Sequence, residues 1–291
     1  MSAELRKAVD SLARTAAIVH LWSKELEDNF FDIWPIQPDE VPGVFEPFLS
    51  MPTEKSFEPL ITEVTSAMAL VSNGTGGAGA ELLRGFTGAN PAMGYVSQVG
   101  HDVTRWEGAA QAAFDDIYAG PFEVPVRPNQ FLCLAVLRSS LFAEAAIWKE
   151  AERSVLDLVQ QAEKALYAAI EDDGSDWGFA LTVIGAVAGV VSTVLSGGTT
   201  APVVFSVISA AAGVGSAAVG ETQQAPGALP GMVVAGMLDG VDTIKRAITA
   251  QETKVRDGLD DFLGALEQSA PHLVFQRSSL TERPGVLEVP A

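Results

Sequence analysis

The chain has 291 residues, and 18 Lys and Arg against 37 Asp and Glu give it a formal net charge of −19 at pH 7. This length suits one large domain or two ordinary ones, and the acidic balance excludes a protein that binds nucleic acid through clustered Lys and Arg. The mean hydropathy is nevertheless +0.23, and only 19% of the residues are charged. Soluble domains average about 25%.

The N-terminal segment predicts an amphipathic helix over residues 3–30. Charged residues fill one face, and apolar residues recur on the other at steps of four and three: Leu5, Val9, Leu12, Ala16 and Val19. The segment has no apolar core and no small-residue cleavage site, so we expect no ordinary secretory signal. Five prolines then predict an irregular strap over 31–55. Its aromatic anchors are Phe31, Trp34, Phe45 and Phe48.

Further helices are expected near 56–72 and over 91–118, separated by the breaker-rich SNGTGGAGA that begins at Ser72. Prolines at 121, 125 and 128 predict a loop before the next helix. That helix, over 130–171 and capped by Asn129, carries an apolar heptad. The heptad consists of Leu134, Leu141, Trp148, Val155, Ala162 and Ala169, with Ala145, Val159 and Leu166 in the neighbouring row.

A second heptad predicts a packed helix over 232–269. It consists of Val241, Ile248, Val255 and Phe262, flanked by Leu238, Leu259 and Leu266. The aperiodic tail over 271–291 is expected to be loosely ordered. The lone Cys133 lies in the apolar run FLCLAVL and is interpreted as a buried structural thiol.

Residues 178–220 form 43 consecutive positions without Asp, Glu, Lys or Arg. The turn SGGTT divides this block into halves that are each long enough to span a bilayer core as a helix. Gly185 and Gly189 form a GxxxG motif that permits close helix packing. The flanks are acidic, whereas the cytoplasmic flanks of membrane helices carry Lys and Arg.

Three interpretations of this block stay open. It is a buried helical hairpin in a soluble bundle, a hairpin that inserts into membranes only under some condition, or a constitutive transmembrane hairpin. The last two predict that the protein partitions into detergent or perturbs liposomes, whereas the first predicts neither. All charged residues lie outside the block, so the rest of the chain has nearly ordinary charge content.

A Trp-Glu-Gly motif at 106–108 stands between two helical patterns, in the string DVTRWEGAAQAAFDDIY. Glycine tolerates a tight helix-to-helix turn, and a tryptophan can pack against both arms. The long helix ends in YAAIE, with Tyr167 and Glu171 four positions apart. Together these features resemble the WxG-motif family of type VII (ESX) secretion substrates, in the larger EspB-like or toxin-module form.

The resemblance covers roughly residues 91–171. It implies that Trp106 and Gly108 form the turn of a helical hairpin and that Tyr167 and Glu171 present a YxxxD/E export signal. It further implies a secreted or cell-envelope protein whose partners are the type VII machinery and a small WxG-type helical protein or a second copy of the chain. The chain departs from the short members in length, and in having Tyr167 61 positions after Trp106.

The search for catalytic chemistry finds no recognisable site. His20, His101 and His272 have no metal-ligand spacing. The glycine-rich 74–79 lacks the preceding strand and the GK[S/T] ending of a phosphate loop. Adjacent acidic pairs do not converge on one side of a helix, so Asp115-Asp116, Asp172-Asp173 and Asp260-Asp261 are interpreted as solvated faces or caps. We therefore expect no enzyme, no metal and no cofactor.

The sequence as a whole predicts an all-α fold, an elongated helical bundle with an apolar Gly- and Ala-rich hairpin. The expected parts are a bundle over 1–175, the uncharged hairpin over 176–220, a linker and amphipathic helix over 221–270, and the tail. The leading functional hypothesis is a type VII secretion substrate. The alternatives are an α-helical pore-forming or membrane-perturbing protein that inserts 178–220, and a non-enzymatic scaffold in which the hairpin is buried.

Overall fold

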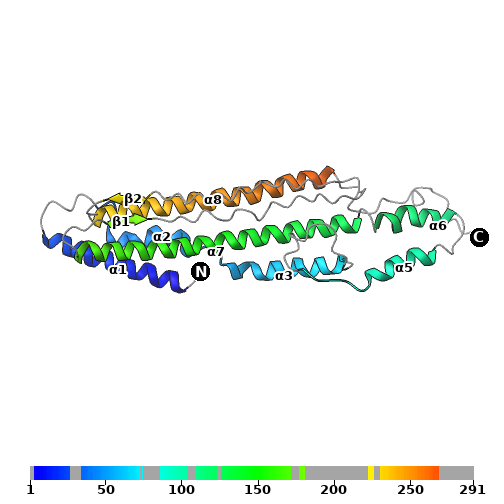
Figure 1. The fold of residues 1–291 in the computed structure, drawn as a ribbon, viewed down its shortest axis with the longest axis horizontal. Coiled ribbons are helices and arrows are strands. Elements are labelled where there is room, and N and C mark those ends of the chain that lie inside the picture. Colours follow the sequence, from blue (N-terminus) through cyan, green and yellow to red (C-terminus); the bar gives the residue numbers. More distant parts are fainter. Residues whose placement is uncertain are drawn as a thin grey trace, which may run out of the picture. The chain divides into compact units, whose positions relative to one another are not determined.

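The fold is an all-α helical bundle, as the heptad patterns predict (Figure 1). The computed structural model describes residues 3–26, 34–72, 74, 86–103, 109–122, 126–171, 177–180, 222–225 and 230–268. Two compact units are present, and each is described by itself. Unit 1 comprises Met1–Glu58, Phe142–Val190 and Ala211–Arg256, and unit 2 comprises Pro59–Leu141, Val191–Ala210 and Asp257–Ala291.

Unit 1 is built on three helices that bury their apolar faces together. They are α1 (Ala3–Leu26), the part of α7 (Arg127–Glu171) from Phe142 onward, and the part of α8 (Pro230–Gln268) up to Arg256. The helices contribute to its core Leu5, Val9, Leu12, Ala16 and Val19 of α1, Val155, Leu158, Val159, Ala162 and Leu166 of α7, and Val233, Val234, Met237, Val241 and Ile244 of α8. Most of the predicted heptad positions in this unit are buried, whereas Trp148, Leu238 and Ile248 are half-buried.

The expected irregular strap over 31–55 is wrong in its central part, which folds as a short 3-10 helix, η2 (Pro38–Glu40), followed by helix α2 (Val41–Leu49). Pro38 and Pro42 stand in the first turns of these helices, where the backbone N–H that proline lacks has no intrahelical acceptor. Pro38 and Pro42 therefore start helices here rather than break the chain, and Pro47 lies inside α2.

The aromatic anchors of this segment are buried as expected where the structure describes them. Phe45 and Phe48 are fully buried in the core of unit 1, and Trp34 packs against it half-buried. Phe31 lies outside the described residues. The Lys245 ammonium of α8 lies 6.0 Å from the centre of the Phe48 ring.

A short antiparallel strand pair also belongs to unit 1. Strand β1 (Trp177–Ala180) pairs with β2 (Thr222–Ala225), and the register runs from Trp177 opposite Ala225 to Ala180 opposite Thr222. Residues 178–180, expected in the apolar helical hairpin, are thus extended. The rest of that block lies outside the described residues, as does the tail over 271–291.

Unit 2 contains most of α3 (Glu54–Val71), α5 (Met93–Val103), α6 (Ala109–Phe114), the π-helical η3 (Asp115–Ala119) and the remaining parts of α7 and α8. Its described core is small. Val136 of α7 and Phe262 of α8 are buried there, with Leu132, Cys133, Leu259, Ala265 and Leu266 packed around them. The Arg138 guanidinium Nε donates a hydrogen bond to Thr65 Oγ1 of α3 at 3.0 Å.

Two expectations about the start of the long helix are wrong. Helix α7 begins at Arg127, so Asn129 lies inside its first turn and does not cap it. The backbone is also helical through Phe122 and again from Val126, where the prolines were expected to make a loop. Pro128 stands in the first turn of α7, where proline is tolerated, whereas Pro121 lies within the helical stretch that is described through Phe122.

Candidate functional site

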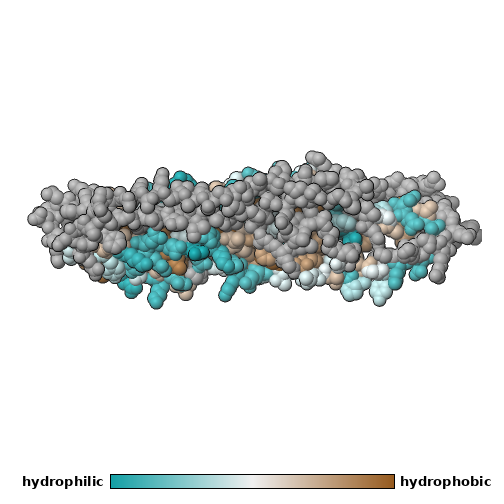
Figure 2. Space-filling view, in the orientation of Figure 1, coloured by the Kyte–Doolittle hydropathy of each residue, from teal (hydrophilic) through white to brown (hydrophobic). Residues whose placement is uncertain are grey.

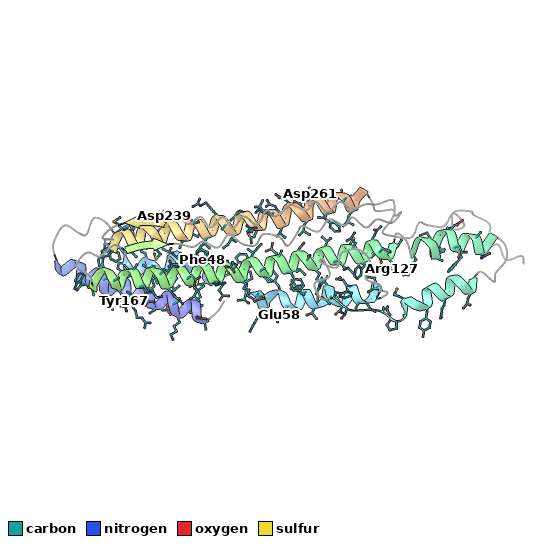
Figure 3. The ribbon with its side chains drawn as sticks, viewed as in Figure 1. Phe48, Glu58, Arg127, Tyr167, Asp239 and Asp261 are labelled. Carbon is teal, nitrogen blue, oxygen red and sulfur yellow. The ribbon has the colours of Figure 1, made fainter. Side chains whose placement is uncertain are left out.

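Of the six residues singled out from the sequence, two lie within the described residues. Tyr167 and Glu171 occupy the last turns of α7 in unit 1 (Figure 3). Trp106 and Gly108, expected at the helix-to-helix turn, and Gly185 and Gly189, expected in the apolar hairpin, fall outside them. The candidate site therefore lies at the C-terminal end of α7.

Tyr167 is exposed at this end of the helix, with 46% of its surface accessible to solvent. Glu171, four residues later, is the last residue of α7. Residues four apart on an α-helix share a face and have Cβ atoms about 5–6 Å apart. The preceding residue Leu166 is buried in the core of unit 1. The helix thus anchors itself through one face and presents Tyr167 on another.

Polar contacts fix α7 against α1 one turn before Tyr167. The Glu163 carboxylate Oε1 accepts hydrogen bonds from Ser11 Oγ at 2.7 Å and from Thr15 Oγ1 at 3.3 Å. Thr15 is buried, with 1% of its surface exposed. Because buried hydroxyls need a partner, this contact sets the register of the two helices.

The two helices run in the same direction, so that their C-terminal ends lie side by side (Figure 1). At this end α1 exposes three large apolar side chains, Ile18 at 54%, Leu21 at 63% and Trp22 at 38%. The spacing of three and four places them on one face of α1. We refer to these three residues and Tyr167, which are exposed toward the C-terminal ends of their helices, as the end surface.

The α1 part of the end surface lies outside the buried row of that helix, which is the row that the apolar periodicity predicts. A second signal was present in the same segment, since Ile18, Leu21 and Trp22 repeat at helical spacing on the otherwise charged face. In the space-filling view, hydrophilic residues predominate over the α1 region, with hydrophobic ones exposed between them (Figure 2).

A half-buried carboxyl lies between α7 and α8 elsewhere in unit 1. Burial raises the pKa of Glu144, and the negative charge of Glu252 on α8 raises it further. A hydrogen bond with Trp148 acts in the opposite direction on this pKa, because it stabilises the charged form. Two carboxyl groups are thus held close enough to repel one another across the helix pair.

Cys133 is half-buried against the small core of unit 2, in keeping with a structural thiol. Burial raises the pKa of this thiol to about 11, so it is almost entirely protonated at neutral pH. A protonated thiol is a poor nucleophile and a poor metal ligand.

The histidines are not brought together within the part of the chain that the structure describes. His20 packs edge-on against Trp34, with ring centres 5.0 Å apart, and His101 lies in α5 of the other unit. His272 falls in the undescribed tail. No group of three or more His, Cys, Asp or Glu side chains able to hold a metal ion occurs among the described residues.

One described helix, residues Arg127–Ala168 of α7, has the length and composition to cross a membrane. Core helices of soluble bundles meet the same criterion, and many α7 side chains from Ala143 to Leu166 are buried in protein. This helix is therefore weak evidence for a membrane-spanning segment.

Comparison with known proteins gives no relative from which a function could be transferred. No protein-family model, no curated protein and no solved structure matches the chain. The functional argument accordingly depends on the residues of this chain.

Proposed function

We propose that the chain is a type VII secretion substrate, exported as a folded helical protein and acting at the cell envelope or outside without enzymatic activity. The observation that supports this most is the position of Tyr167, exposed one turn before the C-terminal end of the long helix α7. An export signal must be reachable while the body that carries it stays folded. The core residues Ala162 and Leu166 hold the body together at the same turns.

The experiment replaces Tyr167 and Glu171 by Ala in cells that have a type VII system. We expect the amount of protein in the culture supernatant to fall at least tenfold, with no loss inside the cell. Tyr95→Ala is the matched control, because Tyr95 is also an exposed helical tyrosine, at 66% exposure. Unchanged export of the Tyr167→Ala, Glu171→Ala variant would refute the proposed signal.

Membrane perturbation is the second candidate, and a specific observation favours it. The pairing of Ala180 with Thr222 places side by side the two residues that flank 181–221, a segment whose one charged residue is Glu221 at its end. The described residues before and after the segment are therefore neighbours, which an inserting hairpin requires. Residues 178–220 carry no charge, and the half that follows the SGGTT turn, 201–220, is long enough to span a bilayer core as a helix.

Leakage of a fluorescent dye from liposomes tests this candidate separately from export. Gly189→Asp or Val207→Asp should abolish leakage and leave export intact, because a charge in a bilayer core is costly. Replacing Tyr167 and Glu171 should do the reverse. A wild-type protein that leaks no dye at neutral or acid pH excludes insertion, and absence of both leakage and export leaves the helical scaffold.

A companion subunit also belongs to the proposal. A small WxG-type helical protein, or a second copy of the chain, would cover apolar side chains that the described residues leave exposed, among them Leu60, Leu70 and Leu263. Sedimentation of the purified chain distinguishes self-association from a monomer that needs a separate partner.

A further inference from the structure

The contact between α7 and α8 in unit 1 includes two acidic residues in otherwise apolar rows. Glu144 of α7 and Glu252 of α8 are both half-buried. Glu144 precedes the buried Ala151 by seven residues, and Glu252 precedes Leu259, which packs against the core of unit 2, by seven residues. Residues seven apart lie on nearly the same face of a helix, so both carboxyl groups belong to the faces through which α7 and α8 pack.

The register of the helix pair places these two residues at almost the same level. The helices α7 and α8 run in opposite directions (Figure 1), and Val136 packs with Phe262. Glu144 follows Val136 by eight residues, and Glu252 precedes Phe262 by ten residues. At 1.5 Å per residue, this difference of two residues is about 3 Å along the helix axes. The two carboxyl groups are therefore neighbours across the contact.

The electrostatic surroundings of Glu144 agree with this position. Burial raises the pKa of Glu144, and the negative charge of Glu252 raises it further. A hydrogen bond with Trp148, one turn along α7, offsets part of the rise in this pKa. Because two half-buried carboxylates repel one another, the state in which one of them is protonated is favoured over the state in which both are ionised.

We propose that Glu144 and Glu252 form a proton-operated latch between α7 and α8. In the closed state Glu144 carries a proton taken from solvent, and its O–H donates a hydrogen bond to a carboxylate oxygen of Glu252. In the open state the proton has returned to solvent, and the repulsion of the two carboxylates separates these turns of the two helices. A hydrogen bond from a carboxyl to a carboxylate is short and charge-assisted, which gives the closed state its stability.

The other charged side chains around the pair have contacts of their own or lie in solvent. Lys149 of α7 forms an ion pair with Glu54 of α3 at 3.0 Å. The Lys245 ammonium of α8 lies over the ring of Phe48. The remaining charged residues nearest in sequence on α3 and α8 are exposed: Glu58, Lys254 and Arg256. The latch is accordingly assigned to the two half-buried carboxyl groups.

The position of the latch indicates what it controls. Unit 1 begins on α7 at Phe142 and ends on α8 at Arg256, so Glu144 and Glu252 lie within about one turn of these points. The main core of the unit, which includes Val155 of α7, lies farther along the helices. Loss of the proton thus loosens the last turns of unit 1 on both helices and leaves its core packed.

Hydrogen–deuterium exchange followed by mass spectrometry, at pH 5.0 and at pH 7.5, tests the latch. Each rate is divided by the intrinsic exchange rate at that pH, so that the remaining difference measures local opening. In the wild type we expect the amides of 141–151 and 248–256 to open at least tenfold more at pH 7.5. The amides of 9–19 in α1, which lie in the core of unit 1, should change less than threefold.

Glutamine variants separate the latch from a general effect of pH. Glu144→Gln and Glu252→Gln should each reduce the tenfold difference to less than threefold, because the amide cannot ionise and can donate a hydrogen bond to the remaining carboxylate. Glu267→Gln is the matched control, because Glu267 is an exposed carboxyl on the same helix as Glu252. It should keep the full difference.

Every outcome supports or overturns the latch. Equal opening of the wild type at the two pH values overturns it. Full pH dependence in Glu252→Gln shows that Glu144 responds to its burial alone, and this overturns the pairing. Thermal melting checks that the variants fold, and Glu252→Gln decides the question if Glu144→Gln does not. The latch depends neither on export nor on membrane insertion, so failure of those proposals leaves it standing.

Discussion

The contact between Glu163 and α1 gives the most direct structural prediction, because it sets the alignment of the helices that carry the end surface. Replacing Glu163 by Ala removes the acceptor of both hydroxyls. Ser11 is half-buried and can turn to water, whereas Thr15, with 1% exposure, keeps a hydroxyl without its side-chain acceptor. The variant thus loses two hydrogen bonds to a charged group. It also leaves the buried hydroxyl of Thr15 without this acceptor.

The magnitude follows from the two distances. The bond from Ser11 at 2.7 Å is short and charge-assisted, and bonds of this kind contribute about 1.5–3 kcal/mol. The bond from Thr15 at 3.3 Å is long and adds less. Removing the partly buried carboxylate also removes the cost of its desolvation, which offsets part of this loss. We therefore expect Glu163→Ala to lower the free energy of unfolding by about 2 kcal/mol.

Urea unfolding followed by circular dichroism at 222 nm measures this change. In a background that carries Ser11→Ala and Thr15→Val, the same Glu163→Ala substitution should cost at least about 1 kcal/mol less, because its partners are already gone. Equal costs in the two backgrounds, or a cost below about 0.5 kcal/mol in the wild type, would refute the contact and the helix register built on it.

Three further outcomes are expected. Phe45→Ala should lower the free energy of unfolding by about 3–5 kcal/mol, since Phe45 is fully buried, while exposed Glu46→Ala stays within about 0.5 kcal/mol in the same urea assay; similar values for both would mean that α2 is not packed. Burial and Glu252 raise the pKa of Glu144 above its ordinary 4.5, so its contribution to stability is fully present below about pH 4.5 and is lost as the pH rises through the higher folded value. Glu144→Gln should therefore stabilise the protein more at pH 7 than at pH 4, and a stability difference independent of pH contradicts this. Cys133, whose pKa burial raises to about 11, should react slowly with iodoacetamide at pH 8 and much faster in urea, and equal rates would show an accessible thiolate.

The helices that could be predicted from the sequence are those whose packing leaves a local periodic pattern. Val155 and Ala162 on α7 and Val241 on α8 are heptad positions, and all three are buried. A helix that buries one face must repeat its apolar residues every three to four positions, whatever it packs against. The existence, type and buried face of α1, α7 and α8 were accordingly predictable.

Helix α2 could not be predicted from proline content, because the same residue breaks a helix interior and starts a helix end. Pro42 stands in the first turn, and the buried positions Val41, Phe45 and Phe48 follow helical spacing. The strand pair was equally hidden, since its four pairs join residues 177–180 to 222–225 with no alternating pattern in either strand.

Only the α7 part of the candidate site could be predicted from the sequence. The Tyr167 and Glu171 pair was found by resemblance to a motif, but its neighbours on α1 depend on contacts between residues 152 and 148 positions apart. No periodicity within a segment contains information about such a pairing. The exposed row of Ile18, Leu21 and Trp22 could have been noticed, although the sequence alone does not place it beside Tyr167.

Export itself is the central claim, and one paired measurement tests it most directly. The wild-type chain is expressed in two otherwise identical strains, one with an intact type VII secretion ATPase and one without it, and the supernatants are compared at equal cell lysis. The proposal predicts full-length protein in the supernatant of the first strain and a level at least tenfold lower in the second. Equal levels in the two supernatants, or protein retained in both strains, would contradict it.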